Sequence, residues 1–268
     1  MSDVEKAPLP LPEQLTEAGT QYYAALDKDM RFAGFIANTV ITIDHQLFEL
    51  EQVLEGKQVK QGPAELAKEN PGARTKVFRS THTQTFVEML LVRFVDSFQK
   101  YLSDLIREVL RKQPAVLSSS HKSLSLEEVL KFDRMDDLLS DIIDRKVSDL
   151  SYQGFKVVRE WCAARGIPIA VSENDLPKVV DYLATRNIIA HNRGRIDKRY
   201  LNTVPTQKLA EGDTRPLGHP ELWDAIVTLT QVVIRTDAAV GAKFGLSVKP
   251  FEASAEASGA APPSETVI

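Results

Sequence analysis

The first long segment of this chain has apolar residues at helical spacing. Between residues 16 and 55 they recur mostly three, four or seven positions apart, which aligns them in one stripe along an α-helix. The stripe consists of Tyr22, Tyr23, Leu26, Met30, Phe35, Ile36, Val40, Ile43, Leu47, Leu50 and Leu54. No part of the chain alternates between strand and helix patterns, so the sequence predicts an all-α helical bundle.

Glycine, proline and serine mark the breaks between the helices. A polar stretch from Gly56 to Arg74 precedes a second helix over about 78–112, which is apolar on more than half of its surface and is therefore expected at the centre of the bundle. Ser125 and Glu128 have the spacing of a capping box. Further helices are expected around 138–150 and 155–162 and over about 175–192 and 220–244, with short extended pieces in 199–217 around a turn at 211–213.

The predicted architecture is one helical domain between two tails. Residues 1–15 and 249–268 contain few apolar residues and are expected to be disordered. Residues 16–248 are expected to form a single domain, with one small β-hairpin inserted before the last helix.

Composition excludes several classes of protein. The net charge is -4, so contact with nucleic acid would need a local basic patch and not a broad basic surface. A single cysteine, Cys162, excludes an internal disulfide framework and a multi-cysteine zinc site. The apolar runs are too short to span a bilayer, and the start, MSDVEKAPLPLPEQ, lacks the order of a signal peptide. A cytoplasmic protein without membrane contact is expected.

The usual motifs of nucleotide, metal and serine chemistry are absent. The sequence contains no GxGxxG, GxxxxGK[ST], HExxH, CxxC or GxSxG, and its histidines are scattered. Asp137, Asp141 and Asp144 share one helix face and could in principle hold a hard cation. An exposed acidic face with Arg134 and Lys146 nearby is the favoured interpretation. No metal and no cofactor are therefore predicted.

The most informative segment is 185–199, at the end of an apolar helix. Arg186, Asn187 and His191 stand out from the apolar residues, and Gly194 follows where a left-handed residue is needed. Lysine or arginine occupies positions 186, 193, 195, 198 and 199, and Asp197 is the one acid among them. Histidine suits proton transfer near neutral pH. From spacing alone, a helix cap and a structural ion pair remain the simpler alternatives.

The residues Arg186-Asn187-x-x-x-His191-Asn192-Arg193-Gly194 resemble the Arg-x(4–6)-His signature of HEPN domains. The likeness is greatest to the bacterial RiboL-PSP-HEPN-like branch, in which an RNxxxHNRG core ends a long bundle helix. It covers roughly residues 80–245 and includes the earlier core helix around 90–102 and a turn at Gly212-Asp213 before the final helix.

The resemblance implies the roles of particular residues. Arg186 and His191 would be the catalytic pair, Asn187 would orient them or contact a phosphate, and Asn192 and Arg193 would support phosphate binding. HEPN sites often add a polar residue from an earlier helix, for which Asp96 or Ser97 is available. HEPN domains commonly dimerise and bring two motifs together. Dimerisation would matter because Arg186 and His191, five residues apart, lie about 140° from one another around one helix. A second copy could bring both side chains to a common groove.

The expected function is that of a homodimeric, metal-independent endoribonuclease that cleaves RNA through the ribose 2′-OH, as a toxin or anti-phage defence effector. An antitoxin or defence-system protein would be a further partner, and DNA would not be cut. The alternative is a non-catalytic HEPN-like module that binds RNA, a nucleotide or a protein partner. A third reading is a helical scaffold in which the motif only caps a helix.

Overall fold

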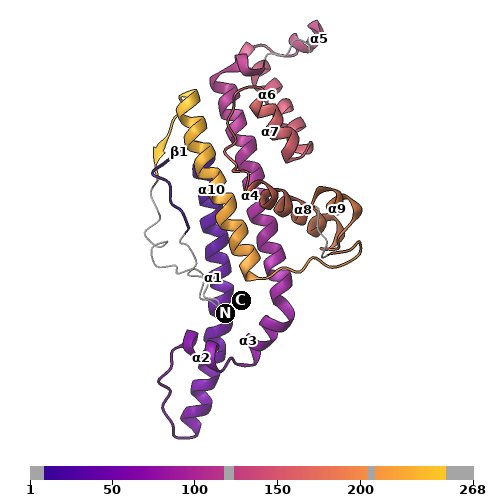
Figure 1. Cartoon of the computed structure of the whole chain (residues 1–268). Helices are drawn as coiled ribbons and strands as arrows, with labels where there is room; N and C mark the ends of the chain where they lie inside the picture. The colour runs from indigo at the N-terminus through magenta and orange to yellow at the C-terminus, as the bar shows by residue number, and fades with distance from the viewer. Residues whose placement is uncertain (1–8, 118–123, 205–208, 252–268) are drawn as a thin grey trace. The chain divides into compact units, whose positions relative to one another are not determined.

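A computed structural model describes residues 9–117, 124–204 and 209–251 (Figure 1). The described chain is mostly helical, and strands β1 (Gln14–Leu15) and β2 (Lys249–Pro250) form one antiparallel pair with Leu15 opposite Lys249. This confirms the predicted all-α fold with a small β pairing. The helices are α1 (Glu17–Leu54), α2 (Pro63–Glu69), α3 (Ala73–Val77), α4 (Thr83–Lys112), α5 (Leu126–Val129), α6 (Met135–Tyr152), α7 (Phe155–Ala163), α8 (Leu176–Asn192), α9 (Lys198–Thr203) and α10 (His219–Phe244).

Most helix positions agree with the apolar periodicity. The helix expected over 16–55 is α1, and the helix expected over 220–244 is α10. The second long helix is preceded by α3 and by a π-helical turn, Phe78–His82, so the chain is helical from residue 73 to 112. The capping box of Ser125 and Glu128 is present in both directions at the start of α5. The expected polar break contains the short helix α2, because Pro63 is favourable in a first helical turn.

Three details differ from the sequence prediction. Residues 199–203, expected to be extended, lie in α9, because Asp197 caps the start of this helix by accepting a hydrogen bond from the Tyr200 amide at 2.7 Å. Before the last helix, the described residues on either side of 205–208 form one isolated antiparallel bridge, Arg195 with Thr214, in place of the predicted hairpin. Both tails are also shorter than predicted, because residues 14–15 and 249–250 pair as strands. Residues 1–8 and 252–268 lie outside the described part.

The chain divides into two compact units, although a single domain over 16–248 is predicted. Helices α1, α4, α8 and α10 each contribute residues to both units, so neither unit is one continuous stretch of chain. Of the described residues, the first unit comprises 9–23, 95–117, 124–183 and 227–251, and the second comprises 24–94, 184–204 and 209–226.

The second half of α4 provides the core of the first unit. The residues that it buries almost completely lie on several sides of the helix, as expected for a central helix. They are Val95, Phe98, Tyr101, Leu105, Ile106, Val109 and Leu110. In the second unit the same helix is more one-sided, and Met89, which the sequence pattern places among its apolar residues, is 53% exposed. The central position is therefore confirmed for the later turns of α4.

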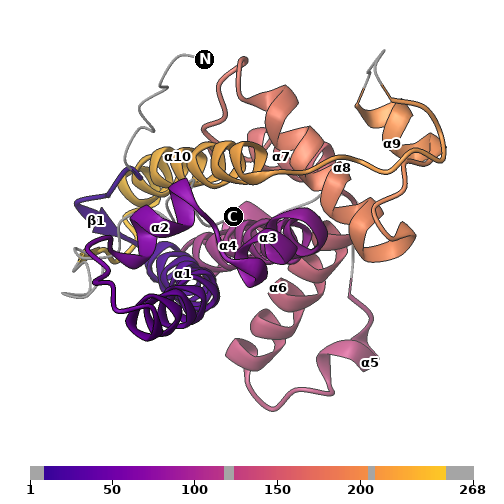
Figure 2. The same ribbon diagram turned by 90° about the horizontal axis from the view of Figure 1, so that it is seen from below.

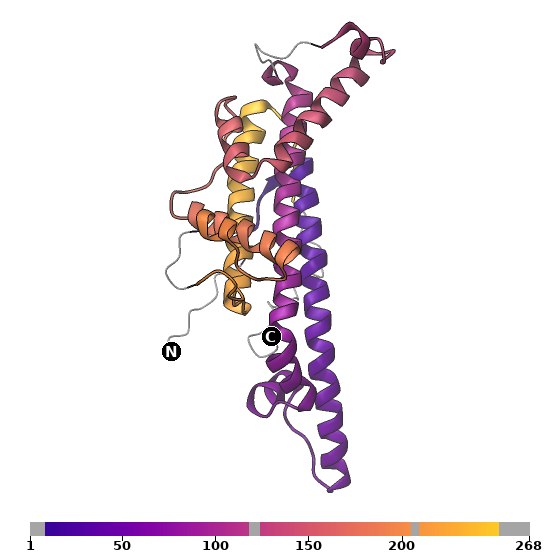
Figure 3. The same cartoon turned by 90° about the vertical axis from the view of Figure 1, so that its right-hand side faces the viewer.

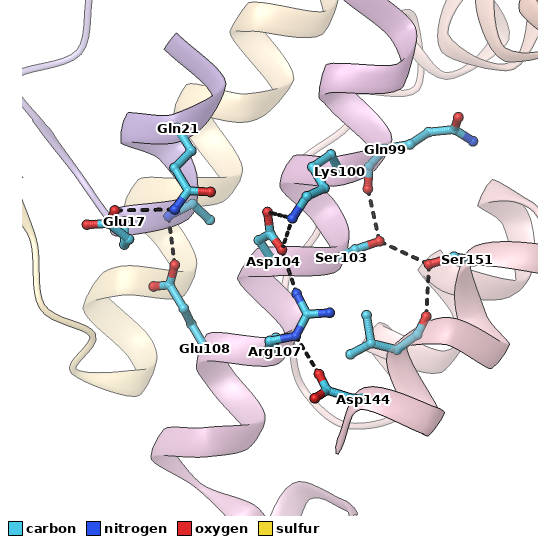
Figure 4. A network of polar contacts seen from close by, with 12 residues as sticks. Glu17, Gln21, Gln99, Lys100, Ser103, Asp104, Arg107, Glu108, Asp144 and Ser151 are labelled. Carbon is cyan, nitrogen blue, oxygen red and sulfur yellow. Dashed lines mark hydrogen bonds and ion pairs between the residues drawn. The ribbon is translucent and has the colours of Figure 1, made fainter. Parts of the chain in front are cut away.

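Buried carboxylates from distant helices close the N-terminus of α1. Asp237 of α10 accepts hydrogen bonds from the Thr16 amide at 2.8 Å and the Thr16 hydroxyl at 2.6 Å. Glu108 of α4 accepts one from the Ala18 amide at 2.7 Å (Figure 4). Burial raises the pKa of both carboxyl groups. These bonds satisfy amides that have no partner within the helix and offset the cost of burying the acids.

A carboxylate of α1 closes another helix in the second unit. Asp44 is buried and accepts hydrogen bonds from the amides of Thr75 at 2.7 Å and Arg74 at 3.3 Å, at the start of α3. Gly72 lies directly against this carboxylate, and a Cβ at that position would overlap Asp44. The close approach explains why glycine stands at position 72.

Helix α10 is long and apolar enough to cross a membrane by length and composition alone. No such segment was predicted, because the uninterrupted apolar runs of the sequence are short. Mean hydropathy over a longer window still passes the threshold, because α10 contains few charged residues. Within the structure, 61% of that apolar stretch is buried. Burial of this extent is also typical of a core helix, so the composition of α10 is weak evidence for a membrane span.

Replacement of Asp237 by alanine is expected to destabilise the protein by about 1–3 kcal/mol, because the amide and hydroxyl of Thr16 would remain buried without a partner. The free energy of unfolding in urea measures the effect. Asp149→Ala, at an exposed position of α6, is the control and should change stability by less than about 0.5 kcal/mol. Equal stability of the two variants would contradict the capping role.

Two glycine-to-alanine changes in the second unit should alter the free energy of unfolding in opposite directions. Gly72→Ala is expected to lower the free energy of unfolding by about 1–3 kcal/mol, because the new methyl group overlaps Asp44. Gly34→Ala, inside α1 with no atom within 4 Å of the added Cβ, should raise it by about 0.5–1 kcal/mol. Chemical unfolding of both variants tests the pair, and a stabilising Gly72→Ala would contradict the packing at Asp44.

Candidate functional site

The segment singled out by sequence lies at the C-terminal end of α8, in the second unit. Helix α8 continues through Asn192, and the next two residues are left-handed, with φ values of 53° for Arg193 and 73° for Gly194. The Gly194 amide donates back to the Ile188 carbonyl at 3.0 Å. The predicted left-handed residue at Gly194 is confirmed. The left-handed conformation of Arg193 was not foreseen.

After this turn the chain folds back on itself. Backbone bonds of 2.9 Å join the amides of Ile196 and Arg215 to the carbonyls of Asp213 and Gly194. Ile196 and Tyr200 are buried against Ala184 and Ile188 of α8. Figures 1 and 2 show α9 beside the C-terminal end of α8. The end of α8, the 194–197 segment and α9 therefore form one small packed structure.

The proposed catalytic pair has one half-buried and one exposed member. Arg186 is half-buried, its Nη1 donates to Asn187 Oδ1 at 3.2 Å, and His191 is exposed. Because α8 is regular between them, Arg186 and His191 point about 140° apart, whereas Asn187 lies one turn before His191 on the same face. Asn187 thus connects the guanidinium of Arg186 to the face that carries His191.

Asn192 and Arg193, expected to support phosphate binding, occupy different environments. The Asn192 Nδ2 atom donates to the Arg195 carbonyl at 2.7 Å, so this amide fixes the turn after the helix. Arg193 is exposed, and its backbone is in the left-handed conformation, which is unfavourable for residues other than glycine. Non-glycine residues in this conformation are concentrated at functional sites.

Exposed cations follow the end of the helix. Arg193, Arg195, Lys198 and Arg199 are exposed, and the acid among them, Asp197, is engaged in capping α9. Four exposed cations so close in sequence create a local positive potential in a protein of net charge -4. This surface suits a phosphate group or another anion.

Asp96, expected to add a polar group from an earlier helix, belongs to the first unit, whereas the Arg186 and His191 segment belongs to the second. Within the second unit, Glu88 of α4 lies near the turn, since a Cβ at Gly194 would be 3.0 Å from its Oε1 atom. Glu88 was missed by sequence analysis, because nothing in its local pattern relates it to residue 194.

Gln84 is the second residue that the sequence did not reveal. Its Nε2 atom donates to Glu88 Oε1 at 2.6 Å and to the Arg215 carbonyl at 3.0 Å, and its Oε1 accepts from the Leu217 amide at 2.9 Å. Gln84 thus fastens the segment before α10 to α4 and orients Glu88. A glutamine four residues before a glutamate is common on helix surfaces and carries no functional signal by itself.

Two of the three aspartates in the acidic row of α6 form ion pairs with arginine. Asp144 accepts from Arg107 of α4 at 2.8 Å, and Asp141 pairs with Arg145 at 2.7 Å (Figure 4 shows the Arg107 contact). Among the described residues, no three histidine, cysteine or acidic side chains come together as metal ligands would. The favoured interpretation of an exposed, charge-paired face agrees with these contacts.

Known proteins provide no assignment for this site. No protein-family model, curated protein or solved structure matches the chain. The case for a function therefore depends on the residues at the end of α8 and on the resemblance of their motif.

Replacement of Arg193 by glycine should raise the free energy of unfolding by about 0.5–1 kcal/mol. Removal of a left-handed penalty of about 1–2 kcal/mol outweighs the freedom that glycine adds to the unfolded chain, about 0.4–1 kcal/mol. Arg195→Gly, at a bridge position without positive φ, should give no gain. Thermal unfolding compares the two, and a less stable Arg193→Gly protein would contradict the strain at this turn.

Proposed function

We propose that this protein is a metal-independent endoribonuclease of the HEPN type, acting in the cytoplasm as a toxin or anti-phage defence effector. The observation that carries the proposal is the arrangement at the end of α8. Asn187 accepts a hydrogen bond from Arg186 and shares a helix face with the exposed His191. The exposed cations that follow supply the positive potential that an RNA backbone requires.

The residue types suit cleavage by internal transfer. The ribose 2′-OH attacks the adjacent phosphorus and loses its proton to a base, and the bond to the 5′ oxygen breaks as that oxygen gains a proton. The products are a 2′,3′-cyclic phosphate and a free 5′-OH end. A histidine serves as base or acid near neutral pH. The fixed fork of the Arg186 guanidinium stabilises the charge on the equatorial oxygens.

One helix alone does not bring both groups to one phosphate, because Arg186 and His191 diverge around α8. Two copies related by a two-fold axis would provide two histidines and two arginines, so one histidine could act as base and the other as acid. Homodimerisation is therefore part of the proposed mechanism. Neutralising antitoxins or other defence proteins are further partners under this proposal.

The competing function is a non-catalytic module that binds RNA, a nucleotide or a protein. The exposed cations at Arg193, Arg195, Lys198 and Arg199 favour an anionic ligand under either function. What separates the two is the need for His191, since a histidine that only binds can be replaced with little loss of affinity, whereas a proton-transfer group cannot be replaced without loss of rate.

His191→Ala and Arg186→Ala should each reduce RNA cleavage by about 100-fold or more, the usual contribution of a proton-transfer or charge-stabilising group. The measurement is the single-turnover rate on labelled tRNA and on single-stranded RNA, with EDTA present throughout. Cleavage by the wild type should persist in EDTA, and the DNA of the same sequence should stay intact because it lacks the 2′-OH.

The matched control is His82→Ala, which removes another exposed histidine of the second unit and should leave the rate unchanged. RNA binding without cleavage by the wild type would favour the non-catalytic module. Equal cleavage by wild type and His191→Ala would exclude the proposed mechanism. Activity that disappears in EDTA and returns with magnesium would exclude metal independence.

A further inference from the structure

The C-terminal half of α1 exposes a long row of apolar side chains. Seven large apolar residues of this helix are exposed over 37% to 80% of their surface. They are Phe32, Phe35, Ile43, Leu47, Leu50, Val53 and Leu54. The opposite side of the same helix is buried in the second unit through Ala33, Ala37 and Ile41. Sequence analysis assigned most of these residues to one apolar stripe, but only its first turns, around Tyr22 to Leu26, are buried.

The exposed row is free of charge. At about 100° per residue, the seven positions fall in an arc of about 120°, which also contains Ile36, Thr39 and Gln46 and no charged residue between 32 and 54. We name this arc the α1 stripe. In Figure 3, α4 runs along one side of the later turns of α1, and no helix of the second unit lies along the other side. An ordinary solvent-facing helix side carries charges, so the α1 stripe has the character of an interface.

The spacing within the stripe is that of a helix-pairing seam. Ile43, Leu47, Leu50 and Leu54 follow one another at intervals of four, three and four, and Ile36 and Val40 extend the same heptad backwards. A large aromatic side chain has about 150–250 Å² of surface, and the seven residues expose roughly half of theirs. Together they offer on the order of 700 Å² of apolar surface per copy. A stable protein interface buries about 800 Å² per partner. The α1 stripe therefore approaches the area that one partner must bury.

We propose that the α1 stripe binds the α1 stripe of a second copy of this chain, with the two helices antiparallel. The direction follows from charge. Glu49, Glu51 and Glu55 flank the C-terminal end of the stripe, whereas Lys28 and Arg31 flank its N-terminal end. At that end Arg31 also pairs with Asp27 at 2.8 Å, and Asp29 is buried, so Lys28 supplies the unbalanced charge. A parallel pair would set the acids of both copies at the same level, where they repel. An antiparallel pair brings them to the level of the partner's cations.

An antiparallel pair centred on Ile43 matches the stripe from end to end. With Ile43 opposite its own copy, Phe32 lies opposite Leu54 of the second copy, and Ile36 lies opposite Leu50. Phe32, Ile36, Ile43, Leu50 and Leu54 then meet apolar residues of the second copy, and Leu47 meets Thr39. This pairing is argued from α1 alone, and it holds whether or not the end of α8 cleaves RNA.

The mass of the full-length protein in solution tests the pairing. Sedimentation equilibrium at micromolar concentration should give twice the 29.8 kDa chain mass for the wild type. The double variant Leu47→Glu, Leu50→Glu should be monomeric, with a dissociation constant raised about 100-fold or more, because the new charges would be buried in the seam. Circular dichroism should show an unchanged helix content, since both leucines are exposed in the single chain.

The control is the double variant Leu126→Glu, Leu130→Glu, which changes two even more exposed leucines in and beside α5 and should remain dimeric. A monomeric wild type overturns the proposal, and so does a dimer that survives the changes in α1. A wild-type monomer that instead binds lipid vesicles also overturns it and assigns the stripe to a membrane surface.

Disulfide cross-linking tests the direction. Under mild oxidation, Ile43→Cys should cross-link to its own copy, and Leu54→Cys alone should not, whereas a mixture of Phe32→Cys and Leu54→Cys proteins should. The native Cys162 is completely buried and should give no background. Rapid self-cross-linking of Leu54→Cys would show a parallel pair and overturn the antiparallel arrangement.

Discussion

Two consecutive left-handed residues, Arg193 and Gly194, determine the surroundings of the candidate site. A right-handed helix cannot continue through them, so α8 ends at Asn192 and the chain turns back to bond with residues 213–215. The turn leaves His191 and Arg193 exposed and buries Gly194 close to Glu88. A side chain at position 194 would press on that carboxylate. One reversal of the backbone therefore sets the positions of the polar residues of α8, the exposed cations and the nearby acid relative to one another.

Elsewhere in the protein, helix ends are closed by carboxylates that come from far along the chain. Asp237 serves the start of α1 in the first unit, and Asp44 serves the start of α3 in the second. Burial of an acid is unfavourable, and the raised pKa of Asp237 reflects this cost. The hydrogen bonds compensate because the first amides of a helix have no partner within the helix. Each such contact also fixes the distance between two long helices of its unit.

The proposed nuclease site and the proposed pairing through the α1 stripe require different surfaces. Phosphate chemistry needs polar groups that are partly exposed and held by neighbours, as Arg186 is by Asn187. Helix pairing needs a continuous apolar strip without charges, as between Phe32 and Leu54. Both requirements are met in the second unit by different helices. A mutation at the end of α8 that abolishes cleavage therefore need not affect helix pairing through α1.

The sequence alone predicted the approximate positions of the long helices and some of their ends. The capping box at Ser125 and the glycine after α8 act through neighbouring residues, so a local pattern is sufficient to predict them. The short helices α2 and α9 were not predicted. The sequence also located Arg186, Asn187 and His191 at a helix end, because only a short stretch of chain is involved.

Tertiary structure decided which surfaces are buried and which distant groups meet. The period of α1 predicts an apolar face, but burial depends on whether another element covers that face, and no helix of the second unit covers it along the later turns. Glu88 near Gly194, and Asp237 bonded to Thr16, are contacts between residues far apart in sequence. Such contacts are set by the packing of whole helices, and no local pattern of residues encodes them.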